Sequence, residues 1–88
     1  MSRRRSDDVI QIAEYVTIGE LVRLTGVRYS TLKYYTEIGI LPFEQEECNL
    51  TRRYLREQAV KRIEEIRELR NKGQNIDSII ETYKKGET

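Results

Sequence analysis

Histidine is missing from this 88-residue sequence, and cysteine occurs once. These two residue types supply many of the ligands of transition metals and many of the nucleophiles and bases of enzymes. Carboxylates, thiols and glycines also form no cluster at the spacing of a ligand site. We therefore expect no metal, no cofactor and no enzymatic activity. A chain of this length has room for one small core but not for a large active-site cavity.

Long apolar runs are missing too. No run approaches the ~20 residues that cross a bilayer, and no signal-peptide pattern is present. We expect a soluble, cytoplasmic protein with no membrane partner. The single thiol, Cys48, fits a reducing compartment. We interpret it as incidental, with a thiol contact between two chains as the alternative.

Residues 17–42, TIGELVRLTGVRYSTLKYYTEIGILP, carry the signals of two short helices joined by a tight turn. Thr17 and Glu20 have the spacing of a capping box at the start of the first helix, and Gly26 ends it. The turn is therefore expected at residues 25–27.

The second helix is expected to begin near Arg28 or Tyr29 and to run to Ile38. Gly39 then supplies a left-handed cap, and Pro42 prevents the helix from resuming. At about 3.6 residues per turn, this helix has a packed face and an outer face. The packed face holds Leu32, Tyr35 and Ile38, and the outer face holds Tyr29, Ser30, Lys33, Tyr34 and Glu37.

The net charge of only +1 hides a local asymmetry in this region. From residue 21 to residue 36 every charged side chain is basic, namely Arg23, Arg28 and Lys33. A polyanion approaching this surface meets attraction and no carboxylate. A solvated helix pair also carries basic residues. However, the capping box, glycine turn, basic face and Gly-Pro stop occur together, which is the layout of a helix-turn-helix DNA-binding unit.

The same stretch resembles the opening of the MerR-type winged helix-turn-helix regulators. There, Gly-Glu-Leu-hydrophobic precedes Thr-Gly-Val, and Thr-Leu-basic-Tyr-Tyr precedes Glu-Ile-Gly-hydrophobic-Leu-Pro. The resemblance covers about residues 15–83. It implies a mainly α fold, a winged helix-turn-helix of about four helices plus a small two-stranded β wing, with residues 27–38 as the recognition helix. Arg28 and Ser30 depart from the family pattern, so the operator sequence cannot be borrowed.

The resemblance places a wing after Pro42, with strands at about residues 40–43 and 50–54 and a turn at 44–49. One of Arg52 and Arg53 would then contact the phosphate backbone or the minor groove. The family's Arg-x-aromatic pattern fits Arg52-Arg53-Tyr54, whereas the spacing from the third helix favours Arg53. We keep both residues as candidates.

The expected tip of the wing carries three carboxylates, Glu44, Glu46 and Glu47, which phosphate would repel. Such a tip either points away from a duplex or meets a basic patch on a neighbouring molecule. The simpler interpretation is a solvated loop.

A third helix is expected over about residues 56–72, with Gly73 closing it and Arg56 beside the wing as a candidate phosphate contact. Its apolar stripe is Ala59, Val60, Ile63, Ile66 and Leu69. Its charged outer face is typical of a helix made soluble by i,i+4 pairs. Asn75 should cap a last helix, from residue 76 to about residue 84, which closes the core.

The first 16 residues are expected to form a basic arm and a further short helix, capped by Ser6 or Asp7. The arm, Arg3, Arg4 and Arg5, either enters a minor groove or is a solvated tail. The winged domain then covers residues 17–84, and residues 85–88 form a tail.

These patterns predict sequence-specific binding of double-stranded DNA by a MerR-like, bacterial, nucleoid-associated transcriptional regulator. The predicted recognition-helix contacts are Arg28, Tyr29, Ser30, Lys33 and Tyr34, and the predicted backbone and wing contacts are Arg23, Arg52, Arg53 and Arg56. A first alternative is an architectural or excisionase-type protein that bends DNA in recombination or segregation. A second is a protein-interaction module whose acidic wing and third helix bind a partner.

Family members usually continue into a coiled-coil helix and an effector domain, for which 88 residues leave no room. We therefore expect no small-molecule effector site in this chain, which is either a piece of a longer protein or a short member. A short member would need self-association on DNA, as a symmetric dimer or a head-to-tail array, because one recognition helix gives too little specificity alone.

Overall fold

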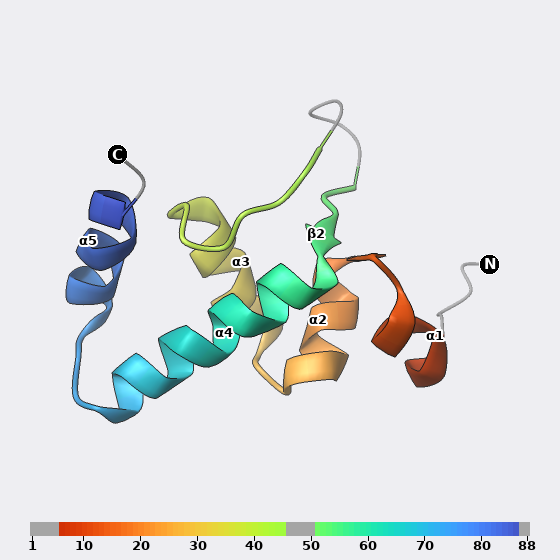
Figure 1. The fold of residues 1–88 in the computed structure, drawn as a ribbon, viewed down its shortest axis with the longest axis horizontal. Coiled ribbons are helices and arrows are strands. Elements are labelled where there is room, and N and C mark those ends of the chain that lie inside the picture. The colour runs from red at the N-terminus through yellow and green to blue at the C-terminus, as the bar shows by residue number, and fades with distance from the viewer. Residues whose placement is uncertain (1–5, 46–50, 87–88) are drawn as a thin grey trace.

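The computed structural model describes residues 6–45 and 51–86 (Figure 1). Its elements in chain order are α1 (Asp7–Ile12), β1 (Tyr15–Val16), α2 (Ile18–Thr25), α3 (Tyr29–Glu37), β2 (Tyr54–Leu55), α4 (Arg56–Asn71) and α5 (Ile76–Gly86). The long helix α4 crosses the molecule, α2 packs on both α3 and α4, and α5 and α1 lie at opposite ends of α4 (Figure 1). The mainly helical winged helix-turn-helix fold is confirmed.

The start of α2 forms as its sequence predicts. The Thr17 hydroxyl accepts from the Glu20 amide at 3.2 Å, and the Glu20 carboxylate accepts from the Thr17 amide at 2.9 Å. This reciprocal pair satisfies two amides that have no partner inside the helix. Gly26 ends α2 with φ of 73°, in the left-handed region that glycine adopts without strain. The predicted bounds of the first helix are therefore confirmed.

Helix α3 begins one residue after Arg28 and ends one residue before Ile38. Gly39 follows with φ of 89°. The amides of Ile40 and Leu41 then both donate to the Tyr35 carbonyl, at 3.1 and 3.3 Å. These bonds satisfy a carbonyl group that the end of the helix leaves open.

The prediction of a strand at residues 40–43 was wrong. Ile40 and Leu41 are buried, and their amides close the end of α3, so they are not available to a strand ladder. The described sheet instead pairs β1 with β2, antiparallel, with Tyr15 opposite Leu55 and Val16 opposite Tyr54. The wing itself has one bridge in the described residues, between Glu44 and Arg53. Residues 46–50, most of the expected wing turn, lie outside the described residues.

The N-terminal segment packs on the core. The further short helix predicted there is present as α1, and the Ser6 hydroxyl accepts from the Val9 amide at its start. The helix ends at Ile12, and Tyr15 and Val16 then form a strand. Ile10 and Val16 are each 1% exposed. The described part of residues 1–16 therefore belongs to the same hydrophobic core as the rest of the chain.

The core joins all the helices and both strands. Its buried apolar side chains are Ile10, Val16, Leu21, Leu32, Tyr35, Ile40, Leu41, Tyr54, Ala59, Ile63, Ile66 and Ile79. The predicted apolar stripe of α4 faces this core, and Asn75 caps α5 by accepting from the Ser78 amide at 2.9 Å. Within the described residues, no helix combines the length and the apolar character needed to cross a membrane.

A buried hydrogen bond links α3 to β2. The Thr36 hydroxyl donates to the Leu32 carbonyl at 2.9 Å and lies 2.8 Å from the Tyr54 hydroxyl, which therefore acts as the donor to Thr36. Burial raises the pKa of Tyr54 above its ordinary value of 10.0. The Tyr54 hydroxyl thus keeps its proton at neutral pH.

We expect Thr36→Val to lower the free energy of unfolding by about 1–3 kcal/mol, because the buried Tyr54 hydroxyl loses its acceptor. Tyr54→Phe should lower the free energy of unfolding by less, since the Thr36 hydroxyl keeps its bond to the Leu32 carbonyl. Urea unfolding followed by circular dichroism measures both. Equal costs for the two variants, or no cost for Thr36→Val, would show that this bond does not stabilise the fold.

Candidate nucleic-acid interface

The two faces of α3 are those predicted from its sequence. Leu32 is 0% and Tyr35 7% exposed, and they pack into the core. Tyr29 is 53% and Tyr34 44% exposed, although both are large aromatic residues. The remaining outward residues of this surface are Arg28, Ser30, Lys33 and Glu37, and all four are exposed. An exposed helix face with aromatic, hydroxyl and basic groups can contact both bases and phosphates.

The charge on this surface comes from basic side chains and from the start of α3. No acidic residue stands in the first turn of α3. The positive end of the helix dipole is therefore not offset by a local carboxylate. Arg28 and Lys33 are exposed beside it, and Arg23 is half-buried in the last turn of α2. Glu20, the acidic residue of α2, is buried in its capping box. Together these groups favour the binding of an anion at this surface.

The structure places the two candidate wing arginines differently. The Arg52 guanidinium lies over the Phe43 ring, 4.9 Å from its centroid, and the Phe43 ring in turn packs 6.2 Å from the buried Tyr54 ring. Arg53 is exposed, and its main chain forms the bridge with Glu44. Arg52 is therefore fixed at the base of the wing by a cation–π contact, whereas Arg53 projects from the wing.

Sequence reasoning missed the role of Tyr15. Its hydroxyl hydrogen bonds to the Glu44 carboxylate, and this bond raises the pKa of Tyr15 above its ordinary value of 10.0, with smaller contributions from desolvation and from the charges of Glu44 and Glu14. The contact ties β1 to the start of the wing. No local pattern signals it, because Tyr15 and Glu44 stand far apart in the sequence. The other residues of the expected tip, Glu46, Glu47 and Cys48, lie outside the described residues.

Three arginines of α4 contact main-chain carbonyls. Arg56 Nε donates to Ala13 at 2.7 Å, Arg62 to Ile40 at 2.6 Å and Arg67 to Thr25 at 2.9 Å. The interpretation of the outer face of α4 as solubilising is therefore wrong for Arg62 and Arg67. For Arg56, the predicted phosphate contact, the Nε group is already used inside the fold.

The arm of Arg3, Arg4 and Arg5 lies outside the described residues. In the described ranges 6–45 and 51–86, no three histidine, cysteine or acidic side chains gather as a metal site.

We expect Arg56→Ala to lower the free energy of unfolding by about 1–3 kcal/mol, because the Ala13 carbonyl loses a charged donor. Arg53→Ala, a matched loss of one exposed arginine three positions before α4 begins, should change it by no more than about 0.5 kcal/mol. Urea unfolding of the free protein compares the two. Equal stability of both variants would mean that the Arg56 bond contributes nothing to the fold.

A model of the MerR HTH family regulatory proteins matches residues 16–85, which is well over half of the chain. Comparisons with curated proteins and with solved structures returned no significant match. The matched range includes the capping box of α2, the whole of α3, the wing and α4, and it leaves out α1. The chain therefore belongs to the MerR helix-turn-helix family of DNA-binding regulatory proteins.

Proposed function

We propose that the protein binds double-stranded DNA in a sequence-specific manner and acts as a transcriptional regulator, with α3 in the major groove and the wing on the phosphate backbone. The observation that carries this proposal is the outer face of α3. Tyr29, Ser30, Lys33 and Tyr34 are all exposed there while the opposite face is buried, and no exposed carboxylate interrupts residues 21–36. A helix in the major groove needs this combination of groups.

Separate roles follow from position and chemistry. We assign Tyr29, Ser30 and Lys33 to base edges, where a lysine would donate to the O6 and N7 acceptors of guanine. Arg28 stands at the start of the same helix and adds positive charge there. Phosphate contacts fall to Arg23, Tyr34, Arg52 and Arg53, with Arg56 contributing through the part of its guanidinium beyond Nε. The basic arm of residues 3–5 would follow the minor groove.

Selection of binding sites from random duplex DNA at two salt concentrations tests the function. Enrichment of one motif supports specific recognition, and the symmetry of that motif reports the arrangement of the bound copies. An inverted repeat indicates a dimer, whereas direct repeats indicate a head-to-tail array and favour an architectural role. Equal retention of all sequences would contradict specific recognition and would indicate a protein that packages DNA non-specifically. No retention would contradict DNA binding and favour the protein-interaction module.

The salt dependence of the affinity is a quantitative check. With about four phosphate contacts, the slope of log affinity against log salt should lie near −3.6 for duplex DNA.

We expect Lys33→Ala and Arg53→Ala to weaken binding in different ways. Lys33→Ala should relax the preference at one base pair, at a cost of about 1–3 kcal/mol for the cognate base. Arg53→Ala should weaken all sequences alike and flatten the salt slope by about one unit. Competition binding to the selected site and to its single-base variants measures both effects. If neither variant changed the affinity, the outer face of α3 and the wing would not be the DNA-binding surface.

A further inference from the structure

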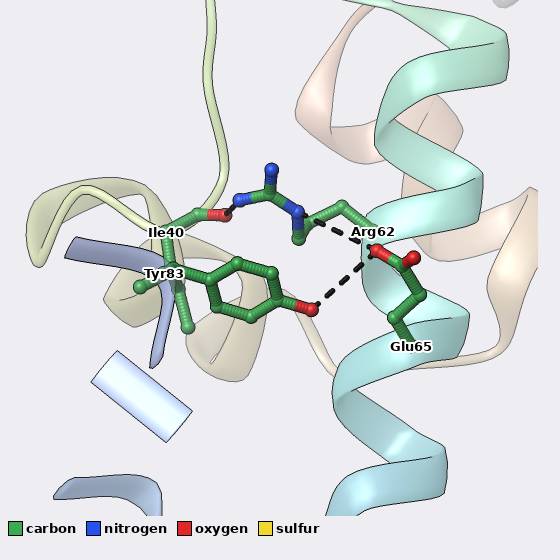
Figure 2. Close-up of polar contacts among 4 residues, drawn as sticks. All are labelled: Ile40, Arg62, Glu65 and Tyr83. Atoms are coloured by element: carbon green, nitrogen blue, oxygen red, sulfur yellow. Dashed lines mark hydrogen bonds and ion pairs between the residues drawn. The ribbon is translucent and has the colours of Figure 1, made fainter. Parts of the chain in front are cut away.

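Arg62 lies where three parts of the molecule meet. Figure 2 shows its guanidinium extending from α4 to the Ile40 carbonyl, with the Tyr83 ring of α5 alongside it. The guanidinium carbon is 4.0 Å from the centroid of the Tyr83 ring, and Nε is 3.7 Å from the Glu65 carboxylate. The Tyr83 hydroxyl also donates to Glu65, at 3.5 Å. A planar guanidinium can stack on a ring and donate from its edge at the same time, which an ammonium group cannot.

The carbonyl that Arg62 contacts belongs to the turn that ends α3. The Ile40 and Leu41 amides both donate to the Tyr35 carbonyl of α3. The peptide group between Ile40 and Leu41 is therefore held by α3 at its N–H and by Arg62 of α4 at its C=O. From Ile40 the chain continues through Phe43 to the Glu44–Arg53 bridge of the wing. The side chains of Ile40 and Leu41 anchor this turn in the core, and Arg62 adds a second hydrogen bond to the peptide group that the Leu41 amide ties to α3.

Tyr83 connects this contact to the position of α5. Ile79 is fully buried and anchors the first turn of α5, whereas Tyr83, one turn later, is half-buried and packs through its ring on Arg62. The main packing partner of α5 is α4. The Tyr83 ring therefore joins the later part of α5 to Arg62.

We propose that Arg62 is a positioning residue for DNA binding. Through Arg62, the packing of α5 on α4 fixes the orientation of the turn that ends α3 and leads into the wing. The proposal rests on the proposed function, since its effect is on how α3 and the wing meet DNA together. In this proposal Arg62 does not contact DNA itself, because its guanidinium is engaged by the Ile40 carbonyl, the Glu65 carboxylate and the Tyr83 ring, with 22% of its side chain exposed.

Arg62→Lys tests the positioning role, because it keeps the charge but removes the planar group. We expect the Kd for the selected DNA site to rise about tenfold, which is about 1.4 kcal/mol, in protein that circular dichroism shows to be fully folded. The salt slope should stay unchanged, since no phosphate contact is lost. Lys61→Arg, a matched exchange at an exposed position of the same helix, should leave the Kd unchanged.

Two outcomes of this binding experiment would overturn the proposal. An unchanged Kd in folded Arg62→Lys protein would show that Arg62 does not position the DNA-binding elements. A raised Kd with a flatter salt slope would show that Arg62 contacts phosphate directly.

Amide hydrogen exchange in the free protein separates this proposal from the proposed function. In Arg62→Lys and in Tyr83→Leu, the Ile40 and Leu41 amides should exchange about tenfold faster, while the Ile63 and Ile66 amides of α4 keep their rates. Tyr83→Phe, which keeps the ring, should behave as the unaltered protein. Faster exchange at all four amides would mean general destabilisation and would overturn the positioning role. If the unaltered protein did not bind DNA, the proposed function would be contradicted. The exchange rates would still show whether Arg62 and Tyr83 stabilise this turn.

Discussion

The carbonyl groups at the ends of helices need partners from outside those helices, and α4 supplies three of them. Ala13 is the C-terminal cap of α1, Thr25 is the last residue of α2, and Ile40 lies in the turn that ends α3. Each accepts a hydrogen bond from a different arginine of α4. A cation at such an end also complements the negative pole of the helix dipole. Helix α4 therefore holds the C-terminal ends of the three preceding helices in place, and the orientation of α3 depends on this arrangement.

Local signals predicted the helices well, because their determinants lie within a few residues of one another. The capping box of Thr17 and Glu20, the left-handed Gly39 and the Asn75 cap are each defined by neighbours in sequence. The exposed and buried faces of α3 followed from the helical period alone. For the same reason, the exposed residues of the candidate DNA-binding surface could be named before the structure was known.

Contacts between distant segments could not be predicted in this way. The apolar residues Ile40 and Leu41 suit a strand and a buried turn equally well, and only tertiary packing decides between them. The pairing of Val16 with Tyr54 joins residues from the two ends of the helix-turn-helix and wing. The alternating charges of α4 likewise do not indicate which arginines turn toward a carbonyl, so the structural use of Arg56 and Arg62 was missed.

The pairing of β1 with β2 also has a consequence for how the chain is made. Strand β1 ends at Val16 and its partner begins at Tyr54, so α2, α3 and the wing all leave the ribosome before the sheet can close. At about 5–20 residues per second, this interval lasts about 2–8 s. During that time β1 has no partner, and the donors of α4 have not yet been synthesised. The recognition helix therefore acquires its fixed orientation only after the segment that follows it has been translated.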